Sequence, residues 1–162
     1  MKNTKYYIPR IAAVFITFTC LTFFAVSAFA GGKGNSANKD LLISFNEYFT
    51  GPNTIDGSSV IAGAFSDQGS RHQDNTIVSQ SADGSQVVVT GTVAINGANG
   101  VFTSKYTGTI YLNNTNIAYI EGTESITGGT GAYAGASGKG TFEATIDFDS
   151  GNIVGVAELK LK

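Results

Sequence analysis

Residues 86–112, QVVVTGTVAINGANGVFTSKYTGTIYL, decide the fold that this chain is expected to adopt. Valine and isoleucine recur at alternate positions from Gln86 to Ile95, and large apolar side chains alternate with threonine and lysine from Val101 to Leu112. Asn96-Gly97 and Asn99-Gly100 lie between the two segments, and both residue types tolerate the positive φ of a tight hairpin turn. A period of two places the apolar side chains on one face of a strand. The stretch therefore predicts an antiparallel hairpin with one apolar face.

The same alternation recurs along the rest of the chain after residue 40, with turn residues between the segments. Glycine accounts for 21 of the 162 residues and proline for only 2, and no segment keeps a period of 3.6 over three turns. Thr50 to Ser59 is predicted as a loop and Ser66 to Arg71 as a turn, whereas Asp83-Gly84 marks a hairpin. Further strands are expected near residues 41–46, 60–65, 73–81, 116–126, 141–148 and 153–161.

About eight short strands joined by hairpin-type turns predict an all-β protein with antiparallel neighbours. An antiparallel up-and-down barrel of about eight strands closes the sheet and leaves no exposed edge. A β-sandwich is the main alternative. The barrel is the prediction adopted here.

The first thirty residues have the features of a signal peptide. Lys2, Lys5 and Arg10 precede an uncharged apolar run, and Ala28-Phe29-Ala30 fits the pattern that signal peptidases cleave. We therefore expect cleavage after Ala30, a secreted or periplasmic protein, a flexible lead-in over 31–38 and a single barrel domain over 39–162. An uncleaved membrane anchor is the alternative, because twenty residues of this run are uncharged. A lipoprotein site at Cys20 is disfavoured, because the preceding Phe18-Thr19 does not match the small residues usual at such sites and Cys20 lies inside the apolar run.

Composition excludes several classes of function. Without residues 1–30 the chain keeps seven basic and twelve acidic residues, and it has no cysteine. A net charge of −5 argues against nucleic acid, and the lack of thiols excludes disulfides and thiolate sites. His72 is the only histidine, so a histidine-rich metal site is excluded. No cofactor is predicted. Asp67, His72 and Asp74 are interpreted as a solvated loop.

A glycine-rich segment links the chain to a known family. Residues 126–141, ITGGTGAYAGASGKGT, resemble the GGTG-x-[FY]-x-G-A-x-G segment of the allene oxide cyclase-like and dirigent-like barrels. Gly97 to Phe102 is similar to the turn before a mid-barrel strand of that superfamily, and the resemblance covers about Val60 to Lys162. It implies an eight-stranded barrel with a central cavity and a homotrimer. Relatives cyclise an unstable fatty-acid epoxide or steer radical coupling, but no functional residue of theirs can be placed on this chain.

The motif itself is interpreted as structural. Glycines that cradle a phosphate need a following helix, whereas Thr141 to Phe148 alternates like a strand. Tyr133 is expected to plug the apolar end of the barrel. The structural motif comprises Gly128, Gly129, Thr130, Gly131, Tyr133, Gly135 and Gly138.

Three residues are candidates for ligand binding, and no catalytic residue is predicted. Tyr106 shares a face with apolar residues, whereas Tyr119 and Glu121 point inward in only one of two possible phases of their strand. The leading hypothesis is an exported, non-catalytic barrel that binds a small apolar ligand or has a surface role, without stable membrane insertion after cleavage. The alternatives are an isomerase or cyclase of the allene oxide cyclase-like type and a small outer-membrane barrel.

Overall fold

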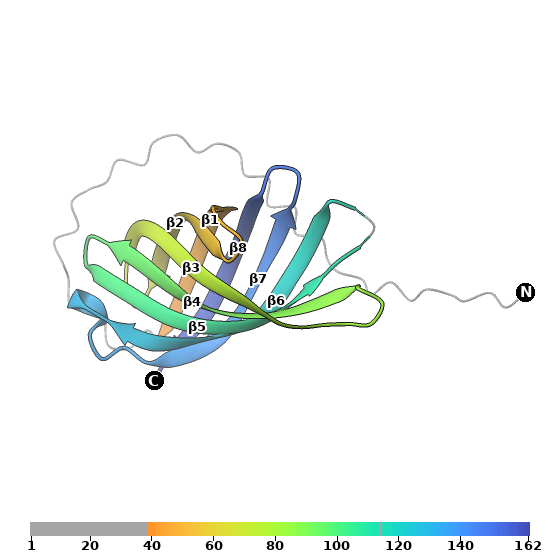
Figure 1. Ribbon diagram of the computed structural model, residues 1–162. Coiled ribbons are helices and arrows are strands. Elements are labelled where there is room, and N and C mark those ends of the chain that lie inside the picture. The colour runs from red at the N-terminus through yellow and green to blue at the C-terminus, as the bar shows by residue number, and fades with distance from the viewer. Residues whose placement is uncertain (1–38, 114) are drawn as a thin grey trace, which may run out of the picture. The chain divides into compact units, whose positions relative to one another are not determined.

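The computed structural model describes residues 39–113 and 115–162 (Figure 1). The signal peptide, the lead-in over 31–38 and Cys20 therefore lie outside the described residues. Eight strands and one short 3-10 helix make up the described chain. They are β1 (Asp40–Phe49), β2 (Thr54–Gly63), β3 (Asp67–Gln80), β4 (Gln86–Gly97), β5 (Gly100–Tyr111), β6 (Ile117–Gly129), η1 (Gly131–Tyr133), β7 (Gly138–Asp147) and β8 (Asn152–Leu161).

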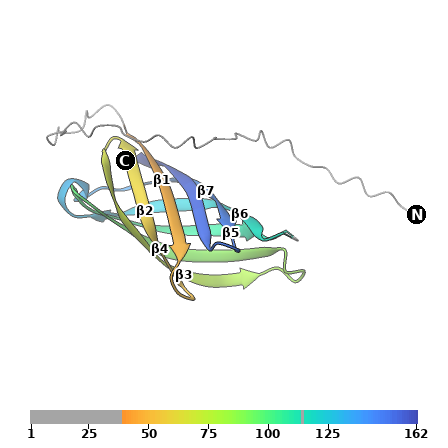
Figure 2. The same cartoon turned by 90° about the horizontal axis from the view of Figure 1, so that it is seen from above.

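The strands form a closed antiparallel barrel in chain order. Each strand pairs with the next one, and β1 pairs with β8 to close the sheet. Figures 1 and 2 show this succession from two directions. The predicted all-β, up-and-down barrel of eight strands is thus confirmed, and the sandwich alternative is wrong.

Side chains alternate between the interior and the outside of the barrel. On β5 the buried side chains include Phe102 and Tyr106, while Thr103 and Lys105 face outward or lie at the rim. The apolar faces predicted for β4, β5, β7 and β8 are all interior. Burial of these faces provides the main stabilisation, at roughly 25 cal/mol per Å² of apolar surface.

Two predicted boundaries are wrong, and both errors come from glycine. The predicted loop over Thr50–Ser59 contains the start of β2, and the predicted turn over Ser66–Arg71 contains the start of β3. Gly57 is not a turn residue: it lies inside β2, opposite Glu47 on β1 and Arg71 on β3. A Cβ atom at Gly57 would lie 2.8 Å from Cγ of Glu47. Glycine therefore gives the two flanking charged side chains room to meet.

One end of the barrel is sealed by η1. Tyr133 is 1% exposed. Its ring packs edge-on against Phe65 and Phe102, with ring centroids 5.0 Å and 5.6 Å away. Its hydroxyl donates to Oδ2 of Asp67 at 3.0 Å, and the backbone N–H groups of Ala98 and Asn99 donate to the same carboxylate at 3.1 Å. Asp67 therefore ties β3, the β4–β5 turn and η1 together.

These contacts also set the ionisation of Asp67. Partial burial raises the pKa of its carboxyl group, but the hydrogen bonds that it accepts outweigh burial and hold the pKa below the ordinary value. The carboxylate is therefore charged wherever the barrel is folded near neutral pH. Sequence reasoning missed this role, because it assigned Asp67 to a solvated loop.

Replacing Gly131 with alanine is expected to destabilise the barrel by about 2 kcal/mol or more. Gly131 has a φ of +59°, and an added Cβ would lie 2.2 Å from the backbone oxygen of Asn99. Gly135→Ala is the matched control, because Gly135 has a φ of +75° with nothing within 4 Å of an added Cβ. It should cost only about 1 kcal/mol of backbone strain. Urea unfolding measures both; equal losses would show that the contact with Asn99 is unimportant.

Candidate ligand cavity

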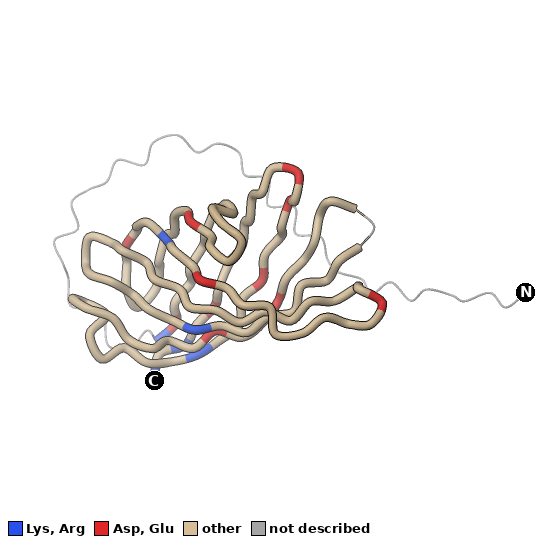
Figure 3. The backbone as a smooth tube through the Cα atoms, in the orientation of Figure 1, with Lys and Arg blue, Asp and Glu red and all other residues tan. Residues whose placement is uncertain are grey.

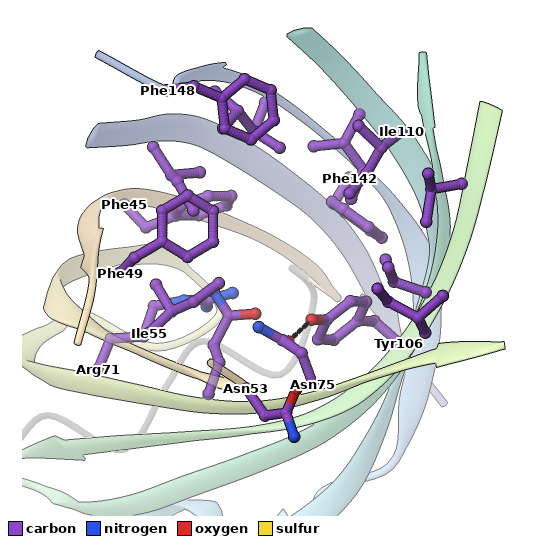
Figure 4. A pocket seen from close by; sticks show the side chains of 18 of the residues that line it. Phe45, Phe49, Asn53, Ile55, Arg71, Asn75, Tyr106, Ile110, Phe142 and Phe148 are labelled. Carbon is purple, nitrogen blue, oxygen red and sulfur yellow. Dashed lines mark hydrogen bonds between the residues drawn. The ribbon is translucent and has the colours of Figure 1, made fainter. Parts of the chain in front are cut away.

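The other half of the barrel holds a cavity of about 270 Å³ (Figure 4). It lies toward the end where Phe49 and Phe148 stack, with ring centroids 6.4 Å apart. These two rings are 43% and 47% exposed, so they stand at the mouth. The wall is mostly apolar and comes from all the strands. Its apolar members include Phe45, Ile55, Val87, Val89, Ile110, Leu112, Ile120, Phe142, Ala144, Ile146 and Ile153.

Inward-facing glycines let large rings lie flat against the wall. An added Cβ at Gly122 would lie 2.7 Å from the ring of Phe142, and one at Gly91 would lie 2.8 Å from the ring of Tyr106. A glycine beneath an aromatic ring keeps the strand continuous while the ring covers the exposed backbone. The rings thus shape the cavity without filling its centre.

A buried ion pair lies at the inner end of the cavity, which we call the floor. Nε of Arg71 donates to Oε1 of Glu47 at 2.8 Å, and the side chains are 3% and 0% exposed. Gln73 donates to Oε2 of the same carboxylate. The guanidinium carbon of Arg71 also lies 4.3 Å from the ring centroid of Phe45, in cation–π contact. Burial raises the pKa of Glu47 above its ordinary value, although Arg71 and Gln73 oppose this shift.

A second set of polar side chains lines the same cavity. Asn75, Gly91, Tyr106 and Glu124 are register partners on four successive strands. The Tyr106 hydroxyl donates to Oδ1 of Asn75, as the dashed line in Figure 4 shows. Ser104 donates to the buried carboxylate of Glu124. Burial, with the nearby charge of Glu47, raises the pKa of Tyr106, so its phenol remains a protonated donor.

Two buried donors in this region lack a protein partner. Within the described part of the chain, Nη1 of Arg71 and Oγ of Ser59 are buried without a hydrogen-bond partner. Buried polar groups are nearly always paired, and an unpaired one costs free energy. Arg71 also lines the cavity, as do the polar side chains of Gln73, Asn75, Tyr106 and Glu124.

The structure separates the three predicted ligand-binding residues. Tyr106 is 7% exposed and lines the cavity, as its face on β5 indicated. Tyr119 and Glu121 lie on the outside of the barrel, because Ala118 and Ile120 occupy the interior face of β6. The inward phase considered for Tyr119 and Glu121 is therefore wrong.

Outside the barrel these residues form their own network. The Tyr119 hydroxyl donates to Oε2 of Glu143 at 2.9 Å, and the Tyr111 hydroxyl donates to Oε1 of Glu121 at 3.2 Å. The two glutamates are direct register partners on β6 and β7. The tyrosine donors thus offset a repulsive cross-strand pair.

Four polar residues at or beside the cavity floor were not predicted to lie inside the barrel. Glu47 continues the inward alternation of β1, so the period-two pattern alone could have placed it inside. Glu124 could not be placed in this way, because apolar residues occur in both phases of β6. Arg71 and Gln73 could not be found that way, because the inward face of β3 is polar and shows no apolar alternation. The glycine-rich motif, by contrast, lies at the sealed end and does not line the cavity.

His72 lies on the outer face of β3 between two carboxylates. Its Nδ1 is 2.6 Å from Oδ1 of Asp56, and its Nε2 is 3.6 Å from Oδ1 of Asp74. The hydrogen bond with Asp56, with the charges of both carboxylates, raises the pKa of His72 above 6.5. The predicted solvated loop is therefore wrong, because Asp67, His72 and Asp74 all lie on β3. His72 pairs with Asp56 and is about half exposed, whereas Asp67 contacts Tyr133.

His72→Gln is expected to lower the melting temperature at pH 5.5 and to leave it nearly unchanged at pH 9. A raised pKa in the folded state means that the protonated imidazole stabilises the fold below pH 6.5. This contribution is lost as the pH rises through the folded-state pKa. The effect should be small, because solvent screens exposed ion pairs. Melting curves of wild type and variant at both pH values test it, and an equal difference at both would contradict it.

Together, fold and cavity define a closed antiparallel barrel with one sealed end and one ligand-sized chamber. Among the described residues, no cluster of three or more histidine, cysteine or acidic side chains could hold a metal ion. No helix in that part of the chain is long and apolar enough to cross a membrane. Comparisons with family models, curated proteins and solved structures gave no match.

Proposed function

We propose that this chain is an exported, non-catalytic barrel protein that binds a small, largely apolar ligand in its cavity. The carrying observation is the chamber of about 270 Å³, with apolar walls and a few polar side chains at its floor. Binding sites for small molecules have this composition: apolar surface supplies affinity and a few polar groups supply orientation. Export is proposed from the signal-peptide features of residues 1–30.

Cavity size restricts the ligand. An engineered apolar cavity of about 150 Å³ holds benzene, so by proportion this chamber suits about ten to twelve non-hydrogen atoms. A monocyclic terpenoid or a substituted phenol has this size. A long-chain fatty acid has about twice as many atoms and would extend out of the mouth.

The outer surface supports a barrel that faces water. The outward residues of β7 include Lys139, Thr141 and Glu143, and acidic residues occur over strands and loops (Figure 3). A membrane barrel needs the opposite arrangement, with an apolar outer belt and a polar interior. We therefore rank the outer-membrane alternative below ligand binding.

Native mass spectrometry of the exported protein, purified without detergent, tests the proposal. We expect a bound organic molecule that is released by collisional activation, and the charge states will also report whether a homo-oligomer forms. A ligand-free mass together with no uptake of small terpenoids or phenols would refute ligand binding.

Ala144→Leu is expected to weaken binding of any cavity ligand by about tenfold or more. Ala144 is buried on β7 and lines the cavity, so the longer side chain takes space from the ligand. Thr145→Leu is the matched control, because Thr145 is exposed on the outer face of the same strand. Titration calorimetry with the recovered ligand compares the three proteins. Equal affinities would place the binding site outside this cavity.

An isomerase or cyclase remains the second candidate, as the resemblance implies. Tyr106 and Glu124 favour it, because a protonated phenol and a carboxylate lie at one level of the same chamber. The cavity favours a substrate shorter than a fatty-acid epoxide. Chiral chromatography of the cyclised product from a short-chain epoxide, with and without protein, tests this activity. A racemic product in both samples would exclude it for that substrate.

A further inference from the structure

We infer that the ligand carries an uncharged oxygen acceptor, such as a ketone or aldehyde carbonyl, that binds the guanidinium of Arg71 at the cavity floor. This inference rests on the proposed function and adds the chemical class of the ligand. Three observations support it. Arg71 has a buried hydrogen-bond donor without a partner, neighbouring side chains restrict the approach to its guanidinium, and two buried carboxylates lie near it.

The guanidinium of Arg71 has a hydrogen-bond donor that no described residue accepts from. Only Nε contacts Glu47, and Nη1 is buried with no partner among the described residues. The side chain is 3% exposed, and a buried donor without an acceptor destabilises the fold. The proposed ligand oxygen supplies this acceptor once the guanidinium turns toward the cavity that Arg71 lines.

Neighbouring groups limit the approach to this guanidinium. Phe45 covers one of its faces at 4.3 Å, and Glu47 occupies the Nε edge. N–H groups of a guanidinium point outward in its plane, so an acceptor must approach in that plane from the cavity side. On β3 the floor residues Arg71 and Gln73 precede Ile77 toward the mouth. The ligand therefore lies with its oxygen at the floor and its apolar body toward the mouth.

The local charge favours a neutral acceptor. Glu47 and Glu124 are 0% and 1% exposed, and Arg71 is the one cation buried with them among the described residues. A ligand carboxylate would add a third negative group beside a single positive one, in a region where charge is costly to bury. The charge of Glu124 already contributes to the raised pKa of Glu47. A carbonyl oxygen pairs with the guanidinium without adding charge.

Three probes of nearly equal shape test this inference on the mature wild-type protein. Carvone is a cyclic ketone, limonene is its hydrocarbon counterpart, and perillate carries a carboxylate on the same ring system. At pH 7.5 we expect carvone to bind about tenfold or more tighter than either of the others, because limonene leaves the donor unpaired. Titration calorimetry gives the three dissociation constants.

Each outcome decides something different. If limonene binds as tightly as carvone, the polar assignment is wrong while the cavity and the proposed function stand. If perillate binds tightest, the acceptor is charged and the inference is overturned. If none of the three binds, the inference fails, and the mass-spectrometric result decides whether the proposed function fails with it.

A paired variant assigns the preference to Arg71. Glu47→Leu combined with Arg71→Met replaces the ion pair by apolar groups, a change that buried pairs often tolerate. We expect this variant to bind limonene and carvone within about twofold of each other. Lys105→Met removes a cation from the exposed face of β5 and should keep the preference for carvone. A preference retained in the paired variant would overturn the role of Arg71.

Discussion

Arg71→Met alone is expected to destabilise the barrel by about 3–5 kcal/mol. The substitution leaves the carboxylate of Glu47 fully buried without its counter-charge. Glu47→Leu should cost a similar amount, because it leaves the guanidinium unpaired. The double variant should recover most of the loss, since replacing both partners by apolar groups removes the buried charges together. Urea unfolding of the four proteins at pH 7 gives the coupling energy.

The same variant should respond to pH in a defined direction. Burial already raises the pKa of Glu47 above 4.5 in the folded state, and removing Arg71 takes away the main charge that opposes the shift. The folded variant then binds more protons than the unfolded chain, so its stability falls as the pH rises above about 4.5. A loss from Arg71→Met that stays constant between pH 5 and pH 8 would contradict this account, as would additive losses in the double variant.

Tyr133→Ala is expected to cost about 3–5 kcal/mol, because it empties the sealed end of the barrel. The ring is fully buried between Phe65 and Phe102, and alanine would leave a cavity there. Tyr133→Phe is the matched control: it keeps the ring and loses one hydrogen bond to the charged Asp67, for about 1–2 kcal/mol.

Ligand affinity tests whether Tyr133 acts only on stability and not on binding. Tyr133 does not line the cavity, so Tyr133→Phe should bind ligand as the wild type does. Urea unfolding measures the two losses, and calorimetry measures the affinity. Equal losses from alanine and phenylalanine would show that the hydrogen bond, not the ring, closes this end.

Local sequence patterns were sufficient where a strand carries apolar side chains on its inner face. The β4–β5 hairpin was predicted almost to its ends, because valine and isoleucine alternate on one strand and aromatic residues on the next. β2 and β3 were misplaced because they contain Gly57 and Gly69, which pattern analysis assigns to turns, and because the inner face of β3 carries the polar Arg71. Arg71 is inside only because partners from other strands meet it there.

The site shows the same limit. Tyr106 was identified because its strand has one clear phase, whereas Glu121 was ambiguous because apolar residues occur in both phases of β6. Arg71 and Glu47 lie 24 positions apart, and nothing local to either signals the other. Their contact follows from the register of three strands over Gly57, which is a property of the closed sheet.

A chamber with one blocked end has a kinetic consequence. Any molecule that occupies it must enter and leave through the single portal beside Phe49 and Phe148. The end that contacts the floor must therefore enter first and leave last. The order of these steps means that the floor contacts must break before a bound molecule can pass these rings, so its residence time is set mainly at the floor.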